Sequence, residues 1–336
     1  MSSSLTLQKL APNVGFGTSG VRALVSDLTP VVVWAYIRAF VAHMRSSGQL
    51  GRASTCVVGW DLRPSSPSIA AAVGAALQQD GLRVEWAGTL PTPALALRCL
   101  SLGAPAIMVT GSHIPFDRNG IKFYTPVGEI LKSDEAAISV INIAPLLPAA
   151  GLVSSMPEMQ ALVGKAMQAG ELGWAILGYR QRYLGLLPTA ALKGLRIGVY
   201  QHSAVGRDFL ADLLGRLGAS VVPLERSDTF VPIDTEAVSV ADETRAAAWC
   251  QQHQLHAVVS TDGDGDRPWV CDEHGHFMRG DVLGILTAQW LGAQAVVTPV
   301  SSNTALEKSG LFSQCVRTRI GSPYVIEAMQ TLLDPG

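Results

Sequence analysis

Short, uniformly apolar runs alternate along the chain with longer stretches of helix-like pattern. The apolar runs predict strands at 55–59, 82–88, 106–110, 195–200, 219–224, 256–260 and 295–300. The stretches between them predict helices at 68–79, 90–101, 202–218, 236–253 and 281–292. Strands that are apolar on both faces must be covered on both, and the intervening helices can cover them. The pattern therefore predicts an α/β fold of tandem domains, with mixed, mostly parallel sheets sandwiched by helices.

Two softer stretches suggest where the domains divide. Residues 143–160 are rich in proline, serine and small side chains, which is typical of a boundary. A second boundary is expected after an acidic loop, near 271–277. We therefore predict units at 1–150, 151–272 and 273–336. The last unit has only about sixty residues, which is below the usual size of a domain.

The composition excludes several classes of protein. Hydrophobic residues make up 48% of the chain and charged residues 15%, which is typical of a folded protein, and the net charge of -2 without a basic run argues against a nucleic-acid partner. Residues 282–306 are uncharged and long enough to span a bilayer, but glycine, glutamine, proline and asparagine interrupt them. This favours a buried helix followed by a strand, and no membrane partner. Because the chain shows no secretory leader pattern and its five cysteines form no C-x-x-C pair, we expect a cytoplasmic location.

The strongest signal for chemistry is the segment DGDGDRP at 262–268, directly after a predicted strand. Asp262, Asp264 and Asp266 alternate with glycines, so three carboxylates can converge on one hard cation. The loop leaves the C-terminal end of a strand, where ligands bind in open α/β sheets. A calcium loop with the same spacing would need a glycine where Arg267 stands, and a helix before it. We therefore predict a metal site of another kind.

A second candidate is GFGTSG at 15–20, which has the spacing of a dinucleotide fingerprint. That fingerprint needs a strand before it and a helix after it. Residues 9–14 do not read as a strand, and Pro30 interrupts the segment that follows. A backbone-rich loop that approaches a phosphate, with Arg22 beside it, is the better interpretation.

The third candidate is TGSHIPFDRNG at 110–120, which delivers Ser112 from the end of a predicted strand. The elbow of serine hydrolases needs glycines where Thr110 and Ile114 stand, so that match fails. His113 is adjacent in sequence, which is a poor way to place a base against Ser112. Two interpretations remain: a serine that ends a strand beside a satisfied histidine, or a phosphorylated serine that supplies an anion to the metal loop.

Taken together, these segments resemble the α-D-phosphohexomutases, the phosphomannomutase and phosphoglucomutase group. The resemblance rests on FGTSGVR (16–22), DLRPSS (61–66), TGSHIP (110–115), NGIK (119–122), DGDGDR (262–267) and RTRIGSPYV (317–325), in the order of the family's motifs. In the usual phosphoserine motif, alanine stands at the position of Gly111 and asparagine at that of Ile114. The resemblance implies that the three units are phosphohexomutase domains 1, 2 and a partial domain 3. The end of domain 3 and all of domain 4 would then be lacking.

The resemblance also implies a site and a reaction. Ser112 would carry the phosphoryl group, Lys122 would transfer a proton with its pKa lowered by nearby cations, and Arg22 and Arg267 would hold phosphoryl oxygens. Mg²⁺ would be held by Ser112, Asp262, Asp264 and Asp266. Substrate or phosphate would contact Thr18, Ser19 and His113.

The implied enzyme is an isomerase, a phosphomannomutase or phosphoglucomutase that interconverts hexose 1-phosphate and hexose 6-phosphate. A hexose 1,6-bisphosphate would serve as activator and intermediate. One alternative is a truncated, weakly active or non-catalytic remnant that binds a sugar phosphate. A second alternative is a phosphoglucosamine mutase, which is disfavoured because Ser19 stands where that group has aspartate. The choice of sugar and the oligomeric state stay open.

Overall fold

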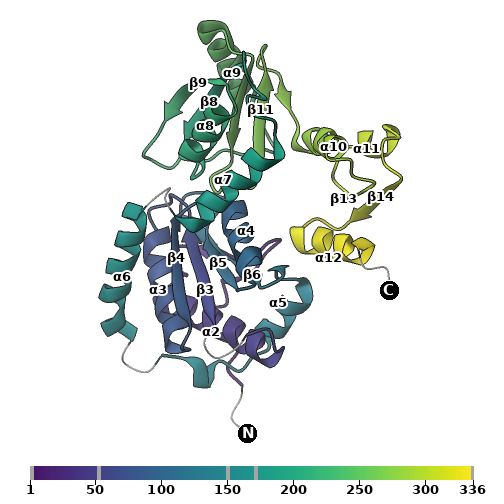
Figure 1. The fold of residues 1–336 in the computed structure, drawn as a ribbon. Coiled ribbons are helices and arrows are strands. Elements are labelled where there is room, and N and C mark those ends of the chain that lie inside the picture. The colour runs from purple at the N-terminus through teal and green to yellow at the C-terminus, as the bar shows by residue number, and fades with distance from the viewer. Residues whose placement is uncertain (1–3, 51–53, 149–151, 170–172, 334–336) are drawn as a thin grey trace.

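Three β-sheets organise the computed structural model, which describes residues 4–50, 54–148, 152–169 and 173–333. They form the lower, upper and right-hand units of Figure 1. The first sheet has the order β1-β2-β6-β5-β3-β4 with β7 beside β6, the second β12-β11-β10-β8-β9, and the third β13-β14. The strands are β1 (Gly15–Phe16), β2 (Val21–Leu24), β3 (Thr55–Trp60), β4 (Arg83–Thr89), β5 (Ala106–Val109), β6 (Arg118–Thr125), β7 (Gly128–Glu129), β8 (Arg196–His202), β9 (Ser220–Arg226), β10 (Ala257–Thr261), β11 (Pro268–Asp272), β12 (Phe277–Met278), β13 (Ala295–Pro299) and β14 (Gln314–Thr318).

Helices cover these sheets and connect their strands (Figure 1). In the first unit they are α1 (Leu7–Leu10), α2 (Pro30–Ser46), α3 (Ser66–Gln79), α4 (Thr92–Leu102), α5 (Lys132–Ser139) and α6 (Leu152–Ala169). The remaining helices are α7 (Trp174–Leu186), α8 (Arg207–Arg216), α9 (Val240–His253), α10 (Gly280–Trp290), α11 (Ala305–Lys308) and α12 (Ser322–Leu333). The predicted α/β fold with mixed sheets is confirmed.

The sheets are less parallel than the uniformly apolar strands suggested. Parallel pairing joins β5, β3 and β4, then β10, β8 and β9, and finally β13 and β14. Strands joined by short connections are antiparallel, as in β5-β6 and β10-β11, because a parallel neighbour needs a long crossover. In this way β6 and β11, which sequence reasoning did not separate out, enter the two larger sheets.

Local sequence explains how the first unit packs. Pro30, which we expected to interrupt the chain, begins α2, where its missing N–H costs no intrahelical hydrogen bond. Thr29 caps that helix, since its hydroxyl accepts the N–H of Val32 at 3.4 Å. On α3, a side chain at Gly74 would meet the Trp86 ring at 2.3 Å, so this glycine lets the helix pack closely on β4.

The packing of α6 bears on the first predicted boundary. Our proposed boundary at residue 150 lies outside the described residues and would place α6 in the second unit. Instead, Met159 and Val163 of α6 are buried in the core of the first unit, and Figure 1 shows α6 running along α3. The apolar face of α6 lies against the first sheet's helix layer, which a boundary drawn from proline and serine content could not show.

The uncharged stretch 282–306 forms most of α10, then β13, then the start of α11. The predicted division into a helix and a strand is therefore confirmed. Among the residues that the structure describes, no helix is long and apolar enough to cross a membrane.

His202 gives the second unit a pH-dependent stability. Its side chain is buried at the end of β8, where Nε2 donates to the carbonyl oxygen of Thr261 at 2.9 Å. Nδ1 is buried without a hydrogen-bond partner in the described chain. Burial lowers the pKa of His202 to about 4, so the folded protein holds the imidazole neutral at pH values where the unfolded chain protonates it.

We therefore expect the contribution of His202 to stability to be complete above pH 6.5 and to be lost as the pH falls towards 4. At pH 5 the loss amounts to about 2 kcal/mol. Urea unfolding of the wild type and of His202→Gln at pH 7 and pH 5 measures it, because other titrating groups cancel in the difference. An unchanged difference between the two proteins would contradict the assignment.

Candidate active site

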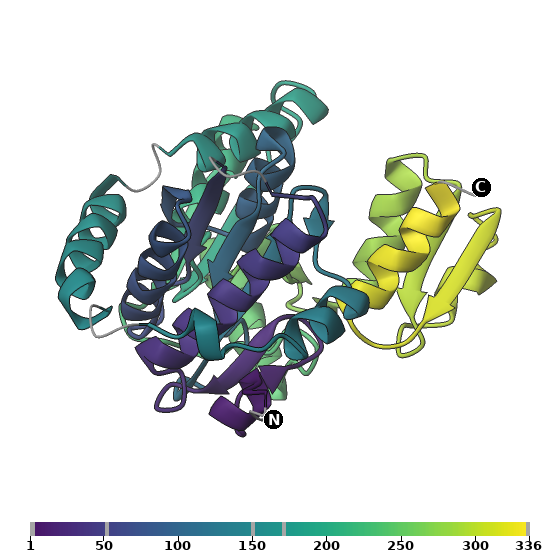
Figure 2. The ribbon, with the colours of Figure 1, turned by 90° about the horizontal axis from the view of Figure 1, so that it is seen from below.

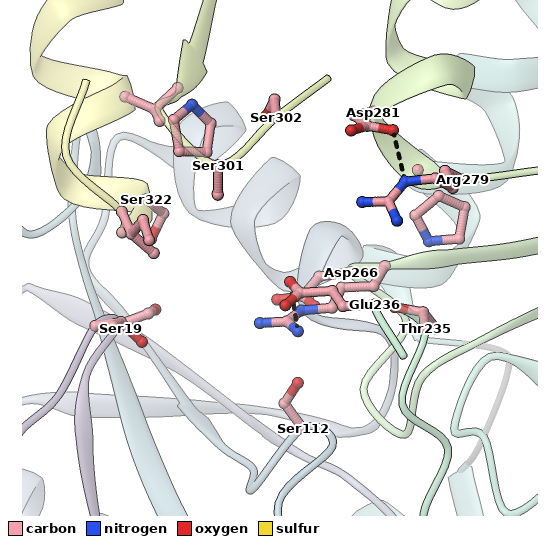
Figure 3. A pocket seen from close by; sticks show the side chains of 18 of the residues that line it. Ser19, Ser112, Thr235, Glu236, Asp266, Arg279, Asp281, Ser301, Ser302 and Ser322 are labelled. Carbon is pink, nitrogen blue, oxygen red and sulfur yellow. Dashed lines mark ion pairs between the residues drawn. The ribbon is translucent and has the colours of Figure 1, made fainter. Parts of the chain in front are cut away.

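A cavity of about 1120 Å³ opens where the three units meet. Residues from all three line it, among them Ser112, Lys122, Glu236, Arg267, Arg279 and Ser322. Figure 3 shows Ser112 on one side of this space, with Arg279, Ser302 and Ser322 arranged around the other. Figure 2 shows α12 as the part of the third unit that approaches the first.

Ser112 is held in an unusual backbone conformation beyond the buried strand β5. Its φ of 51° lies in the left-handed region, which serine seldom adopts. The Ser112 N–H donates to the hydroxyl of Thr110 at 2.8 Å, which stabilises the turn. The Ser112 hydroxyl then donates to Oδ2 of Asp262 at 2.6 Å, and Nδ1 of His113 lies 3.3 Å from Ser112 Oγ. The nearest polar partner of Ser112 is thus a carboxylate from another unit.

The loop after β10 gathers three carboxylates. Asp262, Asp264 and Asp266 each offer an oxygen, and these oxygens all lie within 4.8 Å of one another. The loop is closed because Oδ1 of Asp262 accepts the N–H groups of Gly265, Asp266 and Arg267 at 3.1–3.3 Å. Gly265 has φ +77°, which permits this tight turn. Burial and the two neighbouring carboxylates raise the pKa of Asp262 to about 8.

The cluster fits a hard divalent cation on the chemistry of its donors. All three side chains offer carboxylate oxygens, the ligands that such cations prefer. Asp264 is fully buried, and its Oδ1 has no hydrogen-bond partner in the described residues. Its Oδ2 accepts the hydroxyl of Thr92 at 2.6 Å, so the start of α4 braces the loop from the first unit. A buried oxygen without a partner is costly unless a cation or water satisfies it.

Lys122 reaches the same cluster from β6. Its Nζ donates to Oδ2 of Asp264 at 2.8 Å and to Oδ2 of Asp266 at 2.5 Å. Burial acts to lower the pKa of Lys122, but the two carboxylates outweigh it and raise the pKa well above the usual value. Our expectation that nearby cations lower this pKa is therefore wrong for the described arrangement, because the nearest charges are anionic.

Two arginines face the cavity. Arg267 forms an ion pair with Glu236, with 2.9 Å between Nη1 and Oε1. Burial and the positive charge of Arg267 lower the pKa of Arg22, which places both guanidiniums in one electrostatic environment. Two cations that share a cavity attract an anion between them.

Most of the predicted site residues come together at this cavity. Thr18 and Ser19 line it with Arg22, and the Ser19 hydroxyl donates to Oε1 of Glu129 at 2.6 Å. The hydroxyl of Ser322 donates to the same oxygen at 2.8 Å. His113 stands beside Ser112 rather than among the lining residues, and burial and the charge of Arg267 lower its pKa.

Sequence reasoning missed several residues that line the cavity or brace the residues that do. Glu129 ties the loop at 15–20 to the start of α12, and Thr92 and Glu236 hold Asp264 and Arg267. Glu129 and Glu236 stand in no distinctive pattern. Only Thr92, between two prolines at the start of a predicted helix, carries a local signal of a helix start.

Comparison with known proteins identifies the family. Residues 13–142 match the model of phosphoglucomutase/phosphomannomutase, alpha/beta/alpha domain I, and residues 182–275 match that of domain II. A phosphoglucosamine mutase of Maricaulis maris is 32% identical over 325 residues, which cover 94% of this chain and 70% of the relative. The chain belongs to the phosphoglucomutase/phosphomannomutase family.

Two family members share more of the sequence. The phosphomannomutases of Salmonella muenchen and Sinorhizobium fredii are each 46% identical, over 95% and 94% of this chain. The chain spans 63% and 64% of the length of these two relatives. The part matched to domain I carries Ser112 and Lys122, and the part matched to domain II carries the three aspartates.

Solved structures of the family share the fold. A structure from Thermus thermophilus superposes with a TM-score of 0.75 at 22% identity, covering 95% of this chain and 72% of that one. A phosphoglucomutase/phosphomannomutase family protein from Burkholderia thailandensis gives a TM-score of 0.71 at 20% identity, with 93% and 68% coverage. At these identities the comparison supports the fold alone.

Proposed function

We propose that this family member is a phosphohexomutase that interconverts the 1-phosphate and 6-phosphate of mannose or glucose. The reaction would run through phosphorylated Ser112 and a hexose 1,6-bisphosphate. The observation that carries the proposal is the 2.6 Å contact between Ser112 Oγ and Asp262, inside a cluster of three carboxylates. Such a cluster suits a serine that bears phosphate better than a serine that must lose its proton to a base. The relatives at 46% identity are phosphomannomutases, which supports mannose among the sugars.

The step that we propose moves one phosphoryl group. The free hydroxyl oxygen of a hexose monophosphate bonds to the phosphorus while the bond from phosphorus to Ser112 Oγ breaks. The proton of that hydroxyl passes to Lys122 Nζ in its neutral form, and Ser112 Oγ, which leaves with the electron pair of the broken bond, takes up a proton from solvent water. The reverse step, with the other phosphoryl group of the bisphosphate, restores phosphoserine. We propose that Arg22 and Arg267, which line the cavity, hold phosphoryl oxygens in forked hydrogen bonds, and that Thr18, Ser19 and His113 contact substrate or phosphate.

Asp262, Asp264 and Asp266, with a phosphoserine oxygen, are the residues that we propose to hold Mg²⁺. When bound, the ion would neutralise phosphoryl charge and compete with Lys122 for the carboxylates. That competition matters because Lys122 is held protonated by Asp264 and Asp266. Release from both carboxylates would remove the interactions that raise its pKa and make it a better base.

We propose three domains, with the first boundary placed after α6 because Met159 and Val163 belong to the first core. The second domain would be built on the sheet β12-β11-β10-β8-β9 and the third on the sheet β13-β14.

The cysteines Cys56, Cys99, Cys250 and Cys271 are free and buried, which supports a reducing compartment such as the cytoplasm.

Activity is tested with the purified chain, Mg²⁺, catalytic hexose 1,6-bisphosphate and either mannose or glucose 1-phosphate. We expect the corresponding 6-phosphate to accumulate and intact mass to show one phosphoryl group, mapped to Ser112. Glucosamine 1-phosphate, as the third substrate, tests the alternative that the chain is a phosphoglucosamine mutase. The relative that is 32% identical is an enzyme of that name.

Absence of any 6-phosphate from all three sugars would refute the mutase. One further candidate is a sugar-phosphate-binding protein without turnover, because Lys122 as held between Asp264 and Asp266 is protonated and cannot accept a proton. Binding of a hexose phosphate that Ser112→Ala leaves unchanged, with no phosphate on Ser112, would support that candidate.

A further inference from the structure

The loop that carries Ser112 rests on two buried charged side chains, Asp61 and Arg63, each 2% exposed. The carboxylate of Asp61 satisfies donors of the loop: its Oδ2 accepts the hydroxyl of Thr110 at 2.8 Å and the N–H of Gly111 at 3.2 Å. The Thr110 hydroxyl in turn accepts the N–H of Ser112 at 2.8 Å. Asp61 therefore fixes the backbone on the N-terminal side of Ser112.

Arg63 satisfies the acceptors of the same loop. Its Nη2 donates to the carbonyl oxygens of Ser112 at 2.9 Å and Ile114 at 2.5 Å, and its Nη1 to those of Pro115 at 2.9 Å and Arg118 at 3.0 Å. Nε lies 3.3 Å from Oδ2 of Asp61, which pairs the two charges. Four carbonyl groups converge on one planar fork, a geometry that lysine cannot reproduce.

Two contacts hold the guanidinium of Arg63 in place. A Cβ at Gly111 would lie 2.5 Å from Arg63 Cζ, so the guanidinium occupies the space that any side chain at 111 would need. Gly111 is also the position at which this chain departs from the alanine of the usual phosphoserine motif. Above the guanidinium, the ring of Phe230 lies with its centroid 4.1 Å from Cζ, at cation–π distance.

Phe230 belongs to the second unit, in the segment between β9 and α9. The same unit touches the loop again at Gly263, where an added Cβ would lie 2.9 Å from the Ser112 carbonyl oxygen and 3.7 Å from the Phe230 ring. One of the contacts between the first and second units thus runs through Arg63 and the Ser112 carbonyl. Arg63 thus contacts the backbone of the proposed phosphate carrier, and Phe230 contacts Arg63.

We propose that Arg63 is a positioning residue for Ser112, and that Phe230, seated on its guanidinium, couples the geometry of the Ser112 loop to the second unit. The inference rests on the proposed function where it concerns phosphoryl transfer. Arg63 touches the loop carbonyls rather than the reacting atoms. Its role is to hold Ser112 Oγ toward the aspartates of the second unit.

The test compares Phe230→Leu with Phe116→Leu and Phe230→Tyr. Phe116 stands in the same loop, is 66% exposed and serves as the matched control. Phe230 is only half-buried, so its replacement by leucine keeps the apolar core of each unit intact. The first readout is hydrogen exchange at the amides of Gly111, Ser112 and Ile114. The second is the rate at which Ser112 takes phosphate from hexose 1,6-bisphosphate.

We expect Phe230→Leu to speed exchange at these amides about tenfold and to slow phosphate uptake about tenfold. The bisphosphate concentration at half-maximal rate should be unchanged, because positioning alters the rate of the step rather than binding. Phe230→Tyr, which keeps an aromatic ring on Arg63, should show the wild-type exchange rate and the wild-type rate of phosphate uptake. Phe116→Leu should also show both wild-type rates. Wild-type exchange in Phe230→Leu would overturn the inference.

Exchange and uptake separate this inference from the proposed function. If the wild type takes up no phosphate but Phe230→Leu loosens the three amides, the proposed function fails and the positioning role stands. If the wild type is phosphorylated and Phe230→Leu shows wild-type uptake and exchange, the positioning role fails alone. Arg63→Lys, assayed in the same way provided that its thermal transition stays cooperative, should match or exceed the effect of Phe230→Leu.

Discussion

Replacing Ser112 with alanine is expected to abolish covalent phosphate uptake and to slow hexose phosphate interconversion by at least about 10⁴-fold. The substitution removes the oxygen that would carry the phosphoryl group, and no other hydroxyl in the described chain occupies its place next to Asp262 at 2.6 Å. Intact mass after incubation with hexose 1,6-bisphosphate measures the uptake. A coupled assay of 6-phosphate formation measures the rate.

The matched control is Ser101→Ala, an exposed serine at the end of α4 whose hydroxyl donates to the Arg98 carbonyl. It should retain wild-type phosphorylation and turnover. Ser112→Ala should cost only about 1 kcal/mol of folding free energy, because it removes the hydrogen bond to Asp262 and the longer contact with His113 while Asp262 keeps its three backbone donors. Phosphate incorporated into Ser112→Ala at the wild-type level would place the carrier on another residue.

Asp264→Asn is expected to weaken Mg²⁺ binding about 100-fold and to slow phosphoryl uptake about 10³-fold. Asp264 is fully buried, and although burial acts against its charge, the ammonium of Lys122 holds its pKa far below the usual range. The amide removes one anionic ligand and leaves Lys122 with Asp266 as its remaining carboxylate partner in the described residues. A cost of about 3 kcal/mol in unfolding free energy follows, since a buried cation loses a buried counter-charge.

Titration calorimetry with Mg²⁺ and urea unfolding measure the two effects separately. Asp228→Asn is the matched control: the Asp228 side chain is 95% exposed and pairs with Arg207 at 3.4 Å, so the variant should keep wild-type Mg²⁺ affinity and lose at most about 1 kcal/mol of unfolding free energy. Wild-type Mg²⁺ affinity in Asp264→Asn would show that the three aspartates do not form the metal site. A loss of affinity without a loss of stability would contradict the salt bridge to Lys122.

The pattern of apolar runs predicted most of the helices and strands that build the two larger sheets. The strands β3, β5 and β8 and the helix α3 begin and end within a few residues of their predicted bounds. The pattern failed where a local signal has two meanings. Pro30 reads as a breaker but begins α2, and the proline- and serine-rich stretch that reads as a linker continues into α6. Tertiary packing decides such cases. Proline is tolerated at the start of a helix such as α2, and α6 is stabilised because its apolar face is buried against the first unit.

The chemical parts of the site can be recognised in the amino-acid sequence: a serine after a buried strand, an acidic loop after another strand, and a lysine downstream of the serine. Each part depends on residues close together in the chain, so spacing and residue type reveal it. How these parts interact depends on the folded arrangement of the chain. Lys122 and Asp264 are 142 residues apart in the chain, yet their contact reverses the expected shift in the pKa of Lys122. Phe230 on Arg63, and Glu129 between Ser19 and Ser322, likewise join distant segments. Charge and packing act through space, and distances in space between distant residues are set by the fold.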